Sequence, residues 1–327
     1  MKPDQPTSRR EFLVRAGQAA AAVAATGLVT YFARDEAGPR PAGTASAAAL
    51  PDFSVHGLEG RMSIAAGADR AKTVRRAISA LGGIGLFIRP GDRVLLKVNA
   101  AFSTPPSISA TTHPDLVAEV ARLCLGAGAS SVVVTDHPIN DPASCFELTG
   151  LAAAARSAGA DVAIPRESDF EPRTLPLGRL IVNWPVLTGP LAGTHKLIGI
   201  APVKDHYRAG ASMSLKNWYG LLGGRRNVFH QNIHEIVKEL ALLVKPTLVI
   251  LDGTVSMMTN GPTGGSLSDL KPTNTMIVST DPVAADAFGA TLLGRQPADI
   301  PYIPMAAVAG AGTANFDLLN PIRVNGT

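Results

Sequence analysis

Two stretches decide the fold: "RPGDRVLLKVN" at Arg89–Asn99 and "THPDLVAEVARLCLGAGASSVVVTD" at Thr112–Asp136. The first is typical of a turn followed by a buried strand. The second predicts a helix with an N-cap at its first residue, Pro114 in its first turn and a glycine at 126 or 128 as its end, followed by another strand. A strand, a helix and a strand in this order form the unit of a parallel sheet with a right-handed crossover.

The rest of the chain repeats this alternation. With 327 residues, 46% of them hydrophobic, 32 Gly and 25 Pro, the composition favours an α/β protein over a helical bundle. We therefore expect a mostly parallel, Rossmann-like layered sheet with helices on both faces, in a single domain over residues 51–327. Helices are expected over 71–81, 142–158 and most of 227–246, and from Asp281 onward; strands or extended stretches are expected in 160–164, 178–185, 195–204, 247–253 and 274–280.

The first 50 residues are typical of an export signal. Arg9 and Arg10 are followed by Phe12 and Leu13 and then by the weakly apolar stretch Ala16–Ala33. This strongly resembles a twin-arginine signal and predicts a periplasmic or extracytoplasmic protein with the twin-arginine translocase as a partner. The stretch is about long enough to be kept as a membrane anchor, so cleavage stays open. Substrates of this pathway are exported folded, which favours a cofactor inserted in the cytoplasm.

Charge and cysteine content exclude two classes of function. The formal net charge is +4, part of it in the first 49 residues, and no basic run interleaved with aromatics follows, so nucleic acid is not an expected partner. Cys124 and Cys145 are the two cysteines of the chain. They cannot by themselves ligate an iron–sulfur cluster, so no protein-ligated cluster is expected. They form either one disulfide or two buried free thiols.

Polar side chains follow several of the predicted strands. Because ligands bind beyond the carboxyl ends of strands in open parallel sheets, these residues are expected to share a cleft. Asp136 and Asp252 have the alternative role of forming turns, and Asp281 is most simply a helix N-cap. The residues at strand ends are Lys97, Asn99, Asp136, His137, Lys204, His206 and Asp252.

Lys216 and Asn217 lie within an apolar, aromatic and glycine-rich stretch, "SMSLKNWYGLLGG" at Ser212–Gly224, which we expect to be extended. Either the pair points into solvent from a loop or an apolar pocket holds it, and we favour the pocket. Burial would lower the pKa of Lys216 unless a carboxylate such as Asp252 pairs with it. Such a lysine can act as a general base, as an anchor for a carboxylate or phosphate, or as an imine former.

Two further motifs leave alternatives open. His230 and His234 are four residues apart on one expected helix, so both could reach a divalent metal, although a single ligand-facing His230 is favoured. The loop "NGPTGG" at Asn260–Gly265 could hold an anion with its backbone amides or simply turn the chain. The chain has no P-loop and no G-x-S-x-G motif, which argues against nucleotide hydrolysis and serine hydrolysis.

The ordered set "PGDRVLLKVN", "THPDL", "VVVTD", "PVKDH", "SLKNWYG", "LDG", "NGPTGG" and "DPVAADAFG" resembles the family catalogued as domain of unknown function 362, over Gly67–Gly294. Some members are fused to ferredoxin-like iron–sulfur domains, so the resemblance implies redox-linked chemistry with a redox partner protein. This chain lacks the cluster cysteines. The resemblance also implies one site, because it includes the stretches that carry Lys97, Asn99, His113, Lys204, His206, Lys216, Asn217, His230, Asp252, Asp281 and Asp286.

These patterns predict an exported α/β enzyme that acts on a small anionic substrate or cofactor. Lys216, His206 and Asp252 are the expected catalytic residues. One alternative is a non-catalytic ligand-binding or cofactor-maturation protein with the same cleft. The other is a metal-dependent hydrolase that uses His230, His234 and an aspartate. The expected ligand-binding residues are Lys97, Asn99, Lys204, Asn217, His113 and Asp136.

Overall fold

The structure is a computed structural model that describes residues 50–326, so the predicted export signal lies outside the described residues. Within this range a nine-stranded sheet has the order β11-β1-β10-β9-β7-β2-β3-β4, with β8 paired to β7. A separate two-stranded sheet pairs β5 with β6. The strands are β1 (Met62–Ala66), β2 (Arg93–Lys97), β3 (Ser131–Thr135), β4 (Asp161–Ala163), β5 (Phe170–Arg173), β6 (Trp184–Leu187), β7 (Lys196–His206), β8 (Gly210–Ser212), β9 (Leu248–Met257), β10 (Leu270–Ser279) and β11 (Ile322–Val324).

The large sheet is mixed but mostly parallel. The pairs β9-β7, β7-β2, β2-β3 and β3-β4 are all parallel, which places the carboxyl ends of these strands at one edge. On the other side, β10 runs antiparallel to both β9 and β1. This arrangement confirms the predicted α/β class with a mostly parallel sheet.

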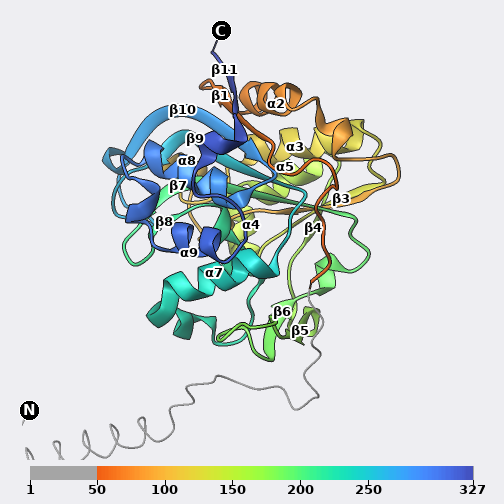
Figure 1. Ribbon diagram of the computed structural model, residues 1–327. Helices are drawn as coiled ribbons and strands as arrows, with labels where there is room; N and C mark the ends of the chain where they lie inside the picture. The colour runs from red at the N-terminus through yellow and green to blue at the C-terminus, as the bar shows by residue number, and fades with distance from the viewer. Residues whose placement is uncertain (1–49, 327) are drawn as a thin grey trace, which may run out of the picture. The chain divides into compact units, whose positions relative to one another are not determined.

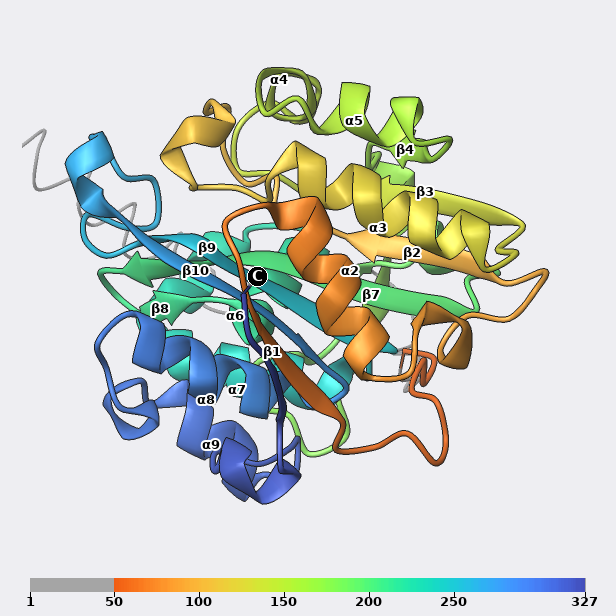
Figure 2. The same cartoon turned by 90° about the horizontal axis from the view of Figure 1, so that it is seen from above.

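Helices cover both faces of the sheet, as Figures 1 and 2 show. Val94 and Leu96 of β2 pack with α2, α3 and α5 on one face, whereas Leu95 belongs to the core on the face of α6, α7, α8 and α9. This alternation along one strand is what a sheet buried on both faces requires. The helices are α2 (Arg70–Ala80), α3 (Pro114–Gly126), α4 (Pro142–Leu148), α5 (Leu151–Ser157), α6 (Ser214–Asn217), α7 (Ile233–Leu243), α8 (Pro282–Leu292) and α9 (Tyr302–Val308).

Three local predictions are wrong. The N-cap of α3 is His113, because the hydroxyl of Thr112 instead donates to Ile200 O and accepts from the Asn99 amide. The helix expected over 142–158 is broken at Gly150, whose φ of 72° is left-handed. The stretch around Lys216 is not extended, since α6 continues into the 3-10 turn Trp218–Leu221.

Two remaining features concern the membrane and the thiols. No helix in residues 50–326 is long and apolar enough to cross a bilayer. Cys124 and Cys145 are both buried and free, which decides between the two alternatives left by the sequence.

Candidate functional site

A cavity of about 200 Å³ opens at the carboxyl ends of β2, β3 and β7. Loops after β2 and β3, the end of β7, the helix α6 and the segment before α7 all contribute to its wall. The strand order explains this, because β7, β2 and β3 are neighbours in the sheet. The lining residues with polar side chains are Asn99, Asp136, His137, Lys204, His206, Tyr207, Ser212, Lys216, Asn217, Tyr219, Arg226 and His230.

A buried ion pair joins the lining residue Asp136 to Lys97, which does not itself line the cavity. Lys97 Nζ is 2.6 Å from Asp136 Oδ1, and both side chains are almost completely shielded from solvent. Asp136 also accepts hydrogen bonds from the backbone amides of Ala100 and His137. Burial lowers the pKa of Lys97, while the adjacent Asp136 opposes this effect. The pair joins the ends of β2 and β3 and leaves Lys97 no free proton donor for a ligand, since Val98 O and Asn217 accept its other hydrogen bonds.

Asn217 and Gly220 attach α6 to this pair. The Asn217 side chain accepts from Lys97 Nζ and donates to Lys97 O and Ile200 O, so its amide is fully used within the protein. A Cβ atom on Gly220 would lie 2.0 Å from Asp136 Oδ1, closer than any side chain allows. Lys97 and Asn217, both predicted to bind substrate, thus hydrogen-bond to each other within the protein, and Asn217 also lines the cavity.

Lys204 and Lys216 bring positive charge to the cavity. Lys204 is 1% exposed, donates to Ala110 O and lies over the ring of Phe102. Burial, reinforced by the charge of Lys216, lowers the pKa of Lys204 to about 7. Burial and the nearby Arg226 lower the pKa of Lys216 to about 8. Lys216 contacts the face of the Tyr219 ring, and among residues 50–326 its ammonium group has neither a hydrogen-bond acceptor nor a carboxylate partner.

His206 is held as a neutral ring with a defined tautomer. Its Nδ1 lies 3.2 Å from the backbone amides of both Arg208 and Ala209, so Nδ1 accepts and the ring proton is on Nε2. Burial, followed by the charges of Lys216 and Lys204, lowers the pKa of His206 to about 2. At neutral pH this side chain is a hydrogen-bond donor through Nε2 and carries no charge.

His230 is neutral in the opposite tautomer. Its Nδ1 is 3.1 Å from the carbonyl oxygen of Asn227, which can only accept, so Nδ1 carries the proton and Nε2 has a free lone pair. Burial and the charge of Lys216 lower its pKa. The rings of His206 and His230 are nearly parallel, with centroids 6.4 Å apart. One cavity thus contains an imidazole donor and an imidazole acceptor side by side.

Arg226 and Tyr219 belong to the site although the sequence did not single them out. The Arg226 guanidinium donates to the carbonyl oxygens of Tyr219, Leu222, His137 and Pro138, which ties the β3 loop to the segment after α6. The Tyr219 hydroxyl donates to Arg226 O. For Tyr219 the sequence offered one signal: its spacing from Lys216 places both residues, together with Gly220, on one side of a helical turn. This spacing does not include Arg226.

Two predicted site residues lie elsewhere. Asp252 accepts from Arg70 Nε at 2.6 Å and from the Thr254 amide, and it does not line the cavity. Its neighbours at 248 and 250 pack on the α2 and α3 face, so the alternation of β9 places it there as well. His113 caps α3. Burial and then the charge of Arg70 lower its pKa, while Asp115 and Asp252 oppose this effect.

The remaining acidic candidates have structural roles. Asp281 caps α8, as its position before Pro282 predicted. Asp286 is buried and accepts from the amides of Ser214 and Leu215 and from the Ser214 hydroxyl, so it holds the start of α6. Burial raises the pKa of this carboxyl to about 7.

The loop Asn260–Gly265 is a turn closed by carboxylates of the protein itself. Asp205 accepts from the Gly261 amide, and Asp269 accepts from the Gly265 amide and the Asn260 side chain. Three of the groups that could have bound an anion are therefore already occupied, and the turn interpretation is favoured. Pro262 alone from this loop lines the cavity among the described residues.

The predicted metal site at His230 and His234 lacks a complete set of ligands in the part of the chain that the structure describes. No group of three or more His, Cys, Asp or Glu side chains between residues 50 and 326 could hold a metal ion. His230 lines the cavity, whereas His234 stacks on Tyr302 outside it. Metal binding by His230 stays an untested prediction, and the described residues provide no group of three ligands that would complete the site.

Fold and site together define an α/β protein with a cationic, imidazole-lined cavity at the carboxyl edge of a mostly parallel sheet. The family described as Domain of unknown function (DUF362) matches residues 94–291, and the chain belongs to this family. It is also similar to thylakoid-associated protein sll1697 of Synechocystis sp., with 24% identity over 258 residues that cover 76% of this chain and 78% of that protein.

Among solved structures, the chain is similar to the lactate racemase apoprotein from Thermoanaerobacterium thermosaccharolyticum. The two chains share 15% identity and a TM-score of 0.37. The match covers 73% of this chain and 57% of that one, so this chain spans less than two thirds of its length.

Proposed function

We propose that this protein is an enzyme that binds a small 2-oxo carboxylate in the cavity and moves a proton at the carbon beside the carbonyl. The observation that carries the proposal is the ammonium group of Lys216, which lines the cavity without a hydrogen-bond or ion-pair partner among the described residues. Lys204 adds a second cation, and the one carboxylate of the lining, Asp136, is already paired with Lys97. A ligand carboxylate supplies the missing negative charge.

The two imidazoles support the proton transfer. His230 Nε2, which has a free lone pair, takes the proton from the carbon, and the electron pair of the C–H bond becomes the double bond of an enolate. The negative charge then resides on the former carbonyl oxygen, where the Nε2–H of neutral His206 donates a hydrogen bond to it. A proton returned from His230 to the carbon completes a cycle in which nothing is oxidised. Asp252, which lies outside the cavity, has no part in this scheme.

We further propose that this chemistry takes place outside the cytoplasm. It rests on the residues of the twin-arginine motif, Arg9 and Arg10, and on the Ala16–Ala33 stretch. Residues 51–327 would be the mature single domain, with the translocase as partner during export and a redox protein as a further candidate partner.

Replacing Lys216 with methionine is expected to weaken pyruvate binding by about 10- to 100-fold, the cost of removing one hydrogen bond to a charged group. Isothermal titration calorimetry measures this directly. The matched control is Lys271→Met, which removes an exposed lysine of β10 that does not line the cavity. Equal pyruvate affinity in the Lys216→Met variant and the control would remove the basis of the proposal.

Replacing His230 with glutamine separates an enzyme from a binding protein. In D2O the wild-type protein is expected to exchange the methyl protons of pyruvate for deuterium, which proton NMR follows as loss of the methyl signal. The His230→Gln variant should lose this exchange by at least about 100-fold, the usual contribution of a general base. If wild-type protein binds pyruvate without accelerating exchange over buffer, the non-catalytic alternative is correct.

Anion binding is expected to weaken as the pH rises. The pKa values of Lys204 and Lys216, about 7 and about 8, mean that both are protonated below pH 7 and that Lys216 is neutral well above pH 8. A bound carboxylate favours the ammonium form, so binding above these values requires proton uptake. Pyruvate affinity should therefore be constant well below pH 7 and fall above it, by about tenfold per pH unit for each lysine that must take up a proton: Lys204 above about pH 7 and Lys216 in addition above about pH 8. Calorimetry in buffers of different ionisation enthalpy detects that proton; a flat profile would contradict the assignment.

A further inference from the structure

The wall of the cavity changes character from its base to its mouth. Lys204 and Asn217 are 1% and 3% exposed, whereas Ile139 and Tyr207, which line the same cavity, are 63% and 72% exposed. A lining residue that is mostly exposed must lie where the cavity opens to solvent. Lys204 is therefore at the base, and the large side chains of Ile139 and Tyr207 are at the mouth.

Backbone hydrogen bonds hold the segments that carry Ile139 and Tyr207 in place. The Ile139 amide donates to Ala101 O at 3.0 Å, and Arg226 binds the carbonyl oxygens of the two residues before it. On the other side, the Tyr207 amide donates to Gly261 O. These bonds make the mouth a preformed feature of the fold and not the tip of a free loop.

Tyr207 also continues the wall formed by His206. The two rings are nearly parallel, with an interplanar angle of 12° and centroids 5.4 Å apart. The guanidinium of Arg208 lies 5.5 Å from the Tyr207 ring centroid and supports it from the exposed hairpin. An apolar group that leaves the base of the cavity would meet this aromatic surface and Ile139, which both belong to the lining.

We propose that the mouth formed by Ile139 and Tyr207 binds the apolar tail of the ligand, so that the substrate class is a medium-chain 2-oxo carboxylate and not pyruvate itself. The inference rests on the proposed function, because the carboxylate must first be held at Lys216. Exposed apolar side chains next to a cationic base match an amphipathic anion in both charge and polarity. A small polar anion would leave Ile139 and Tyr207 exposed in the complex.

The test is the affinity of a linear series, pyruvate, 2-oxopentanoate and 2-oxooctanoate, measured by calorimetry. Each methylene group buried at the mouth should strengthen binding by about fourfold, the value of one buried CH2. The readout is the ratio of 2-oxooctanoate to pyruvate affinity, which should be large in the wild-type protein and fall by at least about tenfold in the Ile139→Ala/Tyr207→Ala variant. Val308→Ala, which truncates an exposed residue of α9 outside the cavity lining, is the matched control and should keep the wild-type ratio.

The outcomes separate the two proposals. If pyruvate binds at Lys216 but the ratio in the wild-type protein is near one, the tail inference is overturned and the proposed function stands. A large ratio that the double variant retains also overturns it, because the tail then lies elsewhere. If no member of the series binds, the proposed function itself fails.

Discussion

Replacement of Lys97 by methionine is expected to lower the free energy of unfolding by about 3–5 kcal/mol, the range for breaking a buried ion pair from one side. Methionine has a similar length and fills much of the same space, but it leaves the carboxylate of Asp136 without its cation. Asp136 is 2% exposed, so water cannot replace the lost partner without opening the wall. Two backbone amides, those of Ala100 and His137, would remain as its donors.

Chemical denaturation followed by tryptophan fluorescence measures this loss, and a double variant isolates its cause. In Lys97→Met/Asp136→Asn the buried charge is removed, and a side-chain acceptor is kept for one of the two amides, which bond to different oxygens of Asp136. We expect the double variant to regain at least about half of the lost stability. If the single and double variants are equally destabilised, packing of the lysine chain and not the unpaired charge holds the wall together.

The part of the site that could be predicted from sequence is the part carried by neighbouring parallel strands. Lys97, Asp136, Lys204 and His206 each follow or end a strand of apolar residues, and the order β7-β2-β3 brings those ends together. The prediction that these residues share a cleft required neither the order of the strands nor the pairing of Lys97 with Asp136. Ligands bind at the carboxyl edge of open parallel sheets in general. The same reasoning failed for Asp252, since it says nothing about the face of the sheet to which a side chain points.

The part that could not be predicted depends on helical register. Arg225 and Arg226 are identical in sequence terms, yet the first is exposed and the second is buried against four carbonyl oxygens. Which of two adjacent arginines is buried follows from the path of the 3-10 segment Arg226–Asn232, and that path is set by tertiary packing. The protonation of His206 could not be predicted either, because its pKa depends first on burial and then on two lysines, and its tautomer depends on amides of a hairpin, all of which converge only in the fold.

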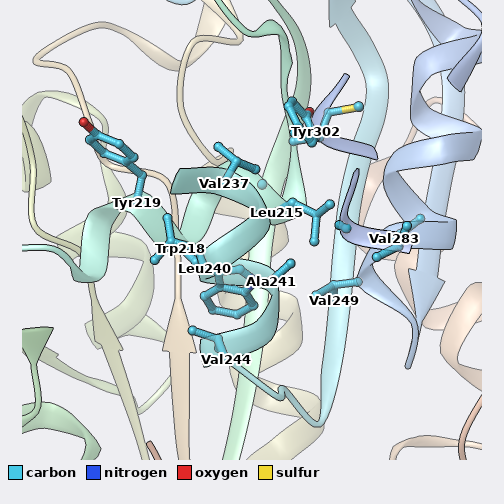
Figure 3. Close-up of a cluster of buried hydrophobic side chains, with 14 of the residues drawn as sticks. Leu215, Trp218, Tyr219, Val237, Leu240, Ala241, Val244, Val249, Val283 and Tyr302 are labelled. Atoms are coloured by element: carbon cyan, nitrogen blue, oxygen red, sulfur yellow. The ribbon is translucent and has the colours of Figure 1, made fainter. Parts of the chain in front are cut away.

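The stretch around Lys216 is amphipathic at helical spacing, and this explains the cation within it. Leu215 and Trp218 belong to the core beside α7, and Tyr219, which Figure 3 labels in the same cluster, also lines the cavity. Lys216, Tyr219 and Gly220 line the cavity on the other side. Core packing on one side of this short segment thus positions the ammonium group on the other.

Replacement of Trp218 by alanine is expected to cost about 3–5 kcal/mol of stability, the range for deleting a large aromatic side chain from a core. Trp218 is 0% exposed, and a Cβ atom on Gly199 would lie 2.6 Å from its ring, so the indole fills its site against the β7 backbone. The indole nitrogen has no hydrogen-bond partner among the described residues, so the loss is one of packing. Thermal or urea unfolding followed by circular dichroism measures it without relying on the removed fluorophore.

The Trp218→Phe variant serves as the comparison, because phenylalanine keeps most of the buried apolar area and removes the unpartnered N–H. We expect it to lose less than half of what alanine loses. A loss below about 1 kcal/mol for Trp218→Ala would mean that the surrounding side chains collapse into the space. Lys216 would then owe its position to Asn217 and Asp286, which fix α6 through hydrogen bonds, and not to the aromatic packing behind it.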